Sequence, residues 1–281
     1  MKNLIGKAVA DKLREIIPEI VRNWRSAKEI DFKKDRSIVT ATDRQVEALL
    51  IPELARLAPQ ASIVGEESAP VDPIAVAELF ERESMWAIDP IDGTINFAAG
   101  LPMFAVSVGL LARSADGFVP AEGIVSFPAL GEIYYTGGGQ IFRRIIGQGD
   151  DVPVDPVEES PTPILLMSSF LAARNLMGSD NPFAKNFRRF GCTVANLTYV
   201  GIGKASATFT RSHIWDFAAG LAIARNAGLV PRVISSGKEK AGFSMGDFSF
   251  GELRNNWRIK APLVLCKDEY FDEVTSLVQD S

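Results

Sequence analysis

Residues 86–97 constrain this chain more than any other stretch, because an apolar run there ends in two carboxylates at a turn. Met85 to Ile88 have the composition of a short buried strand. Pro90 cannot donate to a strand ladder, so we expect the strand to end at Asp89 and the chain to turn. Asp92 follows across that turn. Both carboxylates can therefore face one point.

Oxygen atoms dominate the groups that this turn offers. The Ile91 carbonyl lies between the two carboxylates, and an all-oxygen ligand set favours Mg²⁺ or a similar hard cation. Gly93 has no Cβ, so its N–H can approach a ligand, and Thr94 starts a short helix whose N-terminus attracts anions. The pattern predicts metal-assisted phosphate chemistry. The competing interpretation is an ordinary turn, since Asp-Pro and Asp-Gly are common turn dipeptides.

Composition excludes several classes of protein. The chain has 281 residues, 47% of them hydrophobic and 23% charged, and a net charge of −5, which gives no electrostatic footprint for nucleic acid or an anionic membrane. Cys192 and Cys266 are the only cysteines, too few for a disulfide framework, so we expect a reducing, cytoplasmic setting. Residues 4–24 have the spacing of an amphipathic packing helix, and no apolar run reaches membrane-spanning length.

Two further acidic segments precede the turn. Thr40 to Asp43 open a predicted helix that runs toward Pro59, with Thr42 and Gln45 as a capping box. In that first turn Asp43 is also compatible with a surface charge favoured by the helix dipole. Residues 61–64 predict a short strand, and Glu66 and Glu67 follow its end. The competing interpretation is that the two glutamates are solvated loop charges, as most paired glutamates are. Residues 26–38 are highly charged and predict a solvated, mobile loop.

The rest of the chain predicts layered α and β structure. Residues 104–112, 118–127, 132–135 and 140–144 predict an antiparallel meander, with the glycines at 137–139 in a hairpin. The proline-rich residues 150–163 are a candidate boundary between an N-terminal half, 1–150, and a C-terminal half, 151–281. The second half predicts a strand at 164–168, a strand at 263–266 and a last helix at 269–278. We expect the halves to form one continuous catalytic domain.

A second carboxylate motif begins the apolar helix predicted from Trp215 to about Asn226. Asp216 lies in its first turn, where it must cap, pair or bind metal. His213, the only histidine, has no partner pattern for a catalytic triad and is interpreted as a surface or packing residue.

These segments resemble one known family. Residues 89–94 with Asn96 and Phe97 resemble the signature of the inositol monophosphatase family. Trp215-Asp216, followed by a small-residue helix that ends near Gly228, resembles its second motif, and residues 65–67 and 40–43 match its remaining site segments. All four segments occur in the family's order.

The resemblance implies a fold, a mechanism and a set of site residues. The fold would be an alternating α-β-α-β-α sandwich of the sugar-phosphatase type, commonly a homodimer. Two or three Mg²⁺ ions would activate a water for in-line attack on phosphorus without a phosphoenzyme. Asp43, Thr94 and Glu66 would act on this water. The implied metal ligands are Glu66, Asp89, Ile91 through its carbonyl, Asp92 and Asp216, and the implied substrate-binding residues are Gly93, Thr94, Gly191, Cys192, Thr193 and Asp216.

The substrate would be a small phosphorylated metabolite, a polyol or sugar phosphate monoester with inositol monophosphate as the default, and lithium would inhibit. This chain has Gly191-Cys192-Thr193 where inositol-specific members often carry Gly-Thr-Ala, and it lacks an acid shortly before Trp215. Arg211 and His213 lie there instead, which favours broad specificity or a doubly charged substrate. Fructose 1,6-bisphosphate, histidinol phosphate and a nucleoside bisphosphate are alternative substrates. A non-catalytic family member that binds another protein is the alternative from a different class.

Overall fold

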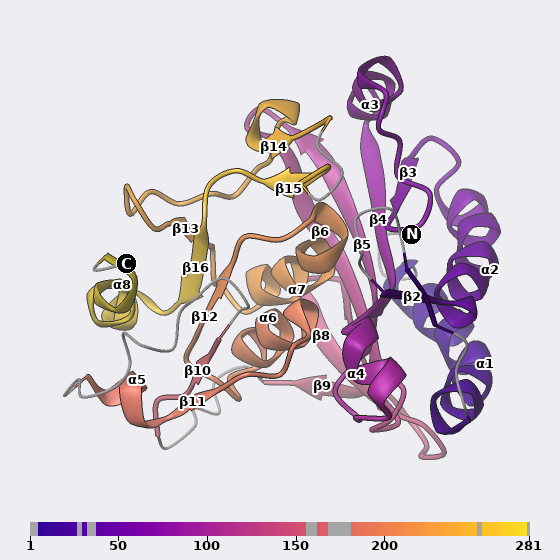
Figure 1. The fold of residues 1–281 in the computed structure, drawn as a ribbon, viewed down its shortest axis with the longest axis horizontal. Helices are drawn as coiled ribbons and strands as arrows, with labels where there is room; N and C mark the ends of the chain where they lie inside the picture. Colours follow the sequence, from indigo (N-terminus) through magenta and orange to yellow (C-terminus); the bar gives the residue numbers. More distant parts are fainter. Residues whose placement is uncertain are drawn as a thin grey trace.

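In the computed structural model, helices and sheets alternate in layers from one side of the molecule to the other (Figure 1). The structure describes residues 5–26, 30–32, 38–155, 162–167, 181–251 and 255–279. The predicted α-β-α-β-α arrangement is therefore present.

Helices α1 (Ile5–Arg25) and α2 (Ala41–Leu57) form the first layer and cover one face of the large sheet (Figure 1). Their apolar residues recur at helical spacing, which gives each helix a buried side. Leu13 and Ile17 of α1 and Leu50 of α2 lie with Trp86 and Ile88 of the sheet in one buried cluster. This packing sets α2 against β4, the strand that carries Asp89 and Asp92.

The large sheet is a meander with one parallel strand at its edge. Its first pair, β3 and β4, is parallel, and every other neighbouring pair is antiparallel. In sheet order the strands are β3 (Ser62–Gly65), β4 (Ser84–Asp92), β5 (Ala105–Ser114), β6 (Gly117–Phe127), β7 (Glu132–Gly137), β8 (Gln140–Ile145) and β9 (Val152–Val154).

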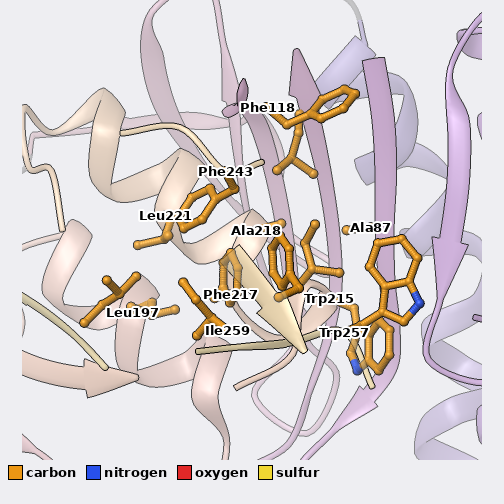
Figure 2. Close-up of a cluster of buried hydrophobic side chains, with 14 of the residues drawn as sticks. Ala87, Phe118, Leu197, Trp215, Phe217, Ala218, Leu221, Phe243, Trp257 and Ile259 are labelled. Atoms are coloured by element: carbon orange, nitrogen blue, oxygen red, sulfur yellow. The ribbon is translucent and has the colours of Figure 1, made fainter. Parts of the chain in front are cut away.

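The middle layer consists of α6 (Thr193–Gly201) and α7 (Ile214–Asn226). Helix α7 is apolar on nearly all sides, which suits its place between the sheets, and Figure 2 shows Phe217, Ala218 and Leu221 among the buried apolar side chains of this region. The helix approaches β6 so closely that a Cβ on Gly123 would lie 2.2 Å from the Ala219 carbonyl oxygen. Glycine at this position lets helix backbone and sheet backbone meet.

The second sheet and the outer helices complete the fold. The five-stranded sheet has the order β11-β10-β12-β16-β13 and mixes parallel and antiparallel pairs. Its strands are β10 (Leu165–Leu166), β11 (Phe187–Arg188), β12 (Ala207–Thr210), β13 (Arg232–Val233) and β16 (Leu263–Cys266), with α5 (Pro182–Lys185), the 3₁₀ turn η4 (Asp268–Tyr270) and α8 (Phe271–Gln279) beyond them. Smaller elements are β1 (Ile30–Phe32), β2 (Ile38–Thr40), α3 (Pro73–Phe80), α4 (Thr94–Ala99), the 3₁₀ turn η3 (Met245–Asp247), β14 (Phe248–Ser249) and β15 (Arg258–Ile259).

Three sequence-based expectations about local structure are wrong, and one alternative interpretation is excluded. The strand does not end at Asp89, because β4 continues to Asp92 with a register shift: Asp89 pairs with Ser107 and Asp92 with Ala105. The extra residue of this bulge accommodates Pro90, which has no N–H for the ladder.

The remaining three corrections concern capping, burial and pairing. The N-cap of α2 is Thr40, with Asp43 completing the capping box, and not Thr42 with Gln45. Asp43 is fully buried and not a surface charge. The segment expected to be a loop contains the antiparallel pair β1 and β2 in its described part, while residues 27–29 and 33–37 lie outside the described residues.

Other expectations are confirmed. The meander, the hairpin at 137–139 and the strands at 62–65 and 263–266 are present. Of the predicted boundary at 150–163, Val152–Val154 joins the large sheet, and residues 156–161 lie outside the described residues. Ser168 of the predicted strand also lies outside them. The division of the chain at residue 150 stays a prediction.

Candidate active site

Asp89 and Asp92 lie at the bulged end of β4, both at most 8% exposed. The Ile91 N–H donates to Asp89 Oδ1 at 2.9 Å, which fixes the first carboxylate. The Thr94 hydroxyl donates to the Ile91 carbonyl oxygen at 3.0 Å. The turn that the sequence predicted to present oxygen atoms is therefore stabilised by its own hydrogen bonds.

Asp92 is held by a segment distant in sequence, the start of α6. The Val194 N–H donates to Asp92 Oδ2 at 2.5 Å, and the Cys192 thiol lies 3.4 Å from the same oxygen. Gly191 precedes the helix with φ of 69°, a conformation that glycine adopts without strain. The three residues at 191–193, predicted to bind substrate, thus form the beginning of a helix directly beside Asp92.

Asn96, in α4, contacts the segment that precedes α6. Its side-chain amide lies 2.6 Å from the Met103 carbonyl oxygen and 2.6 Å from the Phe190 carbonyl oxygen. The segment before α6 is therefore tied to the helix that follows Asp92. The sequence indicated Asn96 only as part of a motif, and its role in joining α4 to the segment before α6 is visible only in the structure.

Asp43 lies in the first turn of α2 as the N3 residue. The Thr40 N–H donates to Asp43 Oδ2 at 2.9 Å, and the Thr40 hydroxyl donates to the same oxygen at 2.5 Å. Strand β2, which ends at Thr40, packs against α4, the helix that starts at Thr94. The strand that leads into the helix of Asp43 therefore lies beside the helix that starts at Thr94.

Glu66 and Asp216 approach the end of β4 from two other elements. Glu66 follows β3, its N–H donates to the Ile88 carbonyl oxygen at 3.0 Å, and its side chain hydrogen-bonds to Asp89. Asp216, in the first turn of α7, accepts the His213 N–H at 3.1 Å. The His213 ring stacks on Trp215 at 5.0 Å between centroids, which fits the predicted packing role.

Burial and mutual repulsion act together on the carboxylates of β4. Burial, followed by the negative charges of Glu66, Asp92 and Asp216, raises the pKa of Asp89 well above its usual range. Burial and then Asp216 raise the pKa of Asp92 to about 7. Within the described ranges no three acidic, histidine or cysteine side chains converge as metal ligands. These carboxylates come near one another without closing into a complete ligand shell.

The chemistry of the side chains nevertheless suits a hard cation. Carboxylate and carbonyl oxygens are the ligands that Mg²⁺ prefers, and a cation would offset the repulsion that raises the pKa of Asp89. The Cys192 sulfur is a soft atom nearby, and burial, followed by the charge of Asp92, raises the pKa of this thiol well above its usual value. The thiol remains a neutral neighbour of Asp92, and the site favours oxygen ligation.

Comparison with known proteins identifies the family. A family model described as "Inositol monophosphatase family" matches residues 4–249. The chain belongs to the inositol monophosphatase family. A "Fructose-1,6-bisphosphatase/inositol-1-monophosphatase" of Thermotoga maritima is 31% identical over 238 residues, 83% of this chain and 85% of that protein. An "Inositol-1-monophosphatase" of Synechocystis is 30% identical over 224 residues, 75% of this chain and 72% of that protein.

Solved structures agree with this assignment. Thermotoga maritima IMPase has a TM-score of 0.73 at 25% identity, covering 97% of this chain and 95% of that chain. An IMPase/NADP phosphatase solved with Mg²⁺ and phosphate has a TM-score of 0.71 at 18% identity, covering 99% and 95%, and shares the fold. The layered fold expected for an inositol monophosphatase family member is confirmed.

Two residues near the site escaped sequence analysis. Arg258 lies beside the start of α7, because its main chain pairs with His213 and its Nε donates to the Arg211 carbonyl oxygen at 2.7 Å. Glu47 is buried one turn after Asp43 in α2. The signal for Glu47 was present, since a carboxylate stands next to Val46 on the apolar side of a predicted helix, whereas nothing in the sequence pointed to Arg258.

Proposed function

We propose that this phosphoric monoester hydrolase of the inositol monophosphatase family uses Mg²⁺ to hydrolyse a small polyol or sugar phosphate, with inositol monophosphate as the default substrate. One observation carries the proposal: Asp89 lies within the electrostatic influence of Glu66, Asp92 and Asp216, carboxylates that come from different elements. A bound cation would stabilise the ionised form of carboxylates that repel one another in this way. The names of the relatives support the substrate class.

The proposed ligands are Glu66, Asp89, Asp92, Asp216 and the Ile91 carbonyl oxygen. A solved structure of the same fold contains Mg²⁺ and phosphate, which supports the choice of metal. Bound Mg²⁺ would neutralise these carboxylates, lower the pKa of water and polarise a phosphoryl oxygen, with two or three ions as the proposed number.

The protein's own groups then bind substrate and move a proton. We assign to Asp43 and Thr94, together with Glu66, the orientation and deprotonation of the attacking water. Thr94 already donates its hydroxyl proton to the Ile91 carbonyl oxygen, so its oxygen can accept a hydrogen bond from the water, and a carboxylate would take up the proton. The N–H groups of Gly93 and Thr94 would bind phosphoryl oxygens. Gly191, Cys192, Thr193 and Asp216 are the proposed contacts to the alcohol.

The test combines turnover with metal binding. Phosphate release from inositol 1-phosphate should require Mg²⁺ and stop in EDTA. Asp92→Asn should reduce turnover by about 100-fold or more and weaken Mg²⁺ binding measured by calorimetry, while its circular dichroism stays unchanged. Unchanged turnover and metal affinity in the variant would refute the site assignment. A protein with no phosphatase activity on any ester would instead be the non-catalytic family member.

Three further properties follow from family membership as proposals. We expect Li⁺ at millimolar concentration to inhibit by competing for a Mg²⁺ position, and a titration at fixed Mg²⁺ measures this. We expect a homodimer, which light scattering detects. A cytoplasmic location fits two buried free cysteines, Cys192 and Cys266. No helix in the described part of the chain could cross a membrane.

A doubly charged substrate is the second candidate, favoured by Arg211 and Arg258. Arg258 is half-buried, and burial followed by the positive charge of Arg211 lowers its pKa. A second anionic group on the substrate would offset this repulsion. We expect a panel of monophosphates and bisphosphates, ranked by kcat/KM, to favour bisphosphates, and Arg211→Ala and Arg258→Ala to reduce that preference. A preference for inositol 1-phosphate that survives both substitutions would exclude this candidate.

A further inference from the structure

Glu47 is a buried carboxylate that the proposed mechanism does not use. It lies in α2 one turn after Asp43 and is 2% exposed. Residues four apart in a helix share a side, so Glu47 faces inward as Asp43 does. A carboxylate buried in this way is unfavourable unless specific contacts hold it, and those contacts indicate what it does.

The contacts of Glu47 are to the turn that carries Glu66. Its Oε2 accepts the Glu67 N–H at 3.0 Å. Gly65 lies directly against the same carboxylate, since a Cβ on Gly65 would be 2.4 Å from both Cδ and Oε2 of Glu47. A larger residue at this position would displace the Glu47 carboxylate. The carboxylate of Glu47 therefore touches the residues on both sides of Glu66.

The same turn is anchored to β4 on its other side. Gly65 pairs with Ile88 in the parallel ladder, and the Glu66 N–H donates to the Ile88 carbonyl oxygen at 3.0 Å. Ile88 immediately precedes Asp89. Two consecutive amides, those of Glu66 and Glu67, are thus bound by β4 and by α2 respectively, which leaves the backbone of Glu66 little freedom to move.

We propose that Glu47 is a positioning residue that holds the turn at 65–67, and with it the Glu66 carboxylate, in the place where Mg²⁺ is bound. This inference rests on the proposed function for the metal. Asp43, a proposed proton acceptor, and Glu47 belong to the same helix. Helix α2 therefore fixes the position of Asp43 relative to the turn at 65–67, which carries the proposed metal ligand Glu66. Partners that orient ligands in this way strongly influence metal affinity.

Glu47 holds the turn through the hydrogen bond that it accepts from the Glu67 N–H, and not through its negative charge. Glu47→Gln keeps an oxygen that can accept the Glu67 N–H and should retain Mg²⁺ affinity within about threefold of the unmodified protein. Glu47→Ala removes the acceptor and should weaken Mg²⁺ binding by about 10–100-fold. Glu53→Ala is the matched control, because Glu53 lies on the same helix and pairs with Arg56, away from the turn.

Two measurements separate positioning from general damage to the fold. Calorimetry gives Mg²⁺ affinity, and hydrogen exchange in metal-free protein reports on the Glu67 amide, which should be protected in the unmodified protein and in Glu47→Gln but exposed in Glu47→Ala. Gly65→Ala provides a second route, because its Cβ would displace the Glu47 carboxylate; it should also weaken Mg²⁺ binding. This variant keeps the test valid if Glu47→Ala does not fold.

The outcomes distinguish this inference from the proposed function. If the unmodified protein binds no Mg²⁺, the proposed function fails. A second outcome is that the unmodified protein binds Mg²⁺ and Asp92→Asn does not bind it. If Glu47→Ala or Gly65→Ala then binds Mg²⁺ as tightly as the Glu53→Ala control, only the role of Glu47 is refuted. Loss of affinity in Glu47→Gln equal to that in Glu47→Ala would refute the hydrogen-bond account, because both variants lack the charge.

Discussion

Asp89, a proposed metal ligand, opposes the stability of the protein that contains it. The carboxylate is buried beside other acids, and its pKa is raised well above the usual value. A raised carboxyl pKa means that the ionised form is less stable in the folded state than in the unfolded state, so at neutral pH this group favours unfolding.

Asp89→Asn should therefore raise the melting temperature in EDTA. It should also abolish the increase in melting temperature that Mg²⁺ gives by binding only the folded protein. Differential scanning fluorimetry with and without Mg²⁺ measures both effects, with Asp116→Asn as an exposed control. A lower melting temperature in EDTA would show that the carboxylate stabilises the fold even without a cation.

At this scale the sequence predicted which acids lie together but not how they are held. Asp89, Asp92 and Asp216 are recognisable because each stands at one end of an apolar segment, where a carboxylate is unfavourable unless it caps, pairs or binds a metal. Arg258 and the amide of Val194 are not recognisable, because each reaches the site through pairing between segments distant in sequence. A main-chain donor also leaves no trace in residue identity.

At the scale of secondary-structure elements, the close contact between α7 and β6 determines where Asp216 is placed. Gly123 allows this contact, as a Cβ there would lie 2.2 Å from the Ala219 carbonyl oxygen. Gly123→Ala should destabilise the protein by about 1–3 kcal/mol, because helix or strand must move. Urea denaturation measures the change, and Gly149→Ala is the control, since no atom lies within 4 Å of its added Cβ. Equal stability of the two variants would contradict the account.

Periodicity predicted most elements but missed the continuation of β4 past Pro90. Proline ends a strand in a regular ladder because it has no N–H to donate. Here a bulge between Asp89 and Asp92 accommodates Pro90, so the strand continues. The short pair β1 and β2 was missed for another reason. Its own residues are mostly strand formers, Ile-Asp-Phe and Ile-Val-Thr, but the charged residues around and between them dominate the composition of residues 26–38 and hide the short strands.

At the scale of the whole molecule, Asp151 joins α1 to the far strands of the large sheet. Its carboxylate accepts hydrogen bonds from Arg144 at 2.6 and 2.7 Å, from Tyr135 at 2.6 Å and from Lys7 at 3.2 Å. The Arg144 guanidinium, followed by Tyr135 and Lys7, holds the pKa of Asp151 below its ordinary value of 3.8. A carboxyl group with a lowered pKa in the folded state stabilises the fold at pH values above its pKa in the unfolded chain. This contribution is lost progressively as the pH falls below about 4.

Asp151→Asn should therefore lower stability at pH 7 and have a smaller effect at pH 3. Thermal unfolding in EDTA gives the stability difference between the unmodified protein and Asp151→Asn at each pH. Asp89 and Asp92, whose raised pKa values act in the opposite direction, are present in both proteins, so their contribution cancels in this difference. A difference independent of pH would show that Asp151 acts through packing alone.

The bond between the Val194 amide and Asp92 spans 102 residues of sequence, and this separation has a consequence for how the chain folds. Contacts between segments so far apart form late, since closing a long loop is opposed by chain entropy. The large sheet can assemble from neighbouring hairpins before α6 arrives, whereas the finished carboxylate site cannot. During refolding, the capacity to bind Mg²⁺ should appear last and so mark the moment at which the chain reaches its native state.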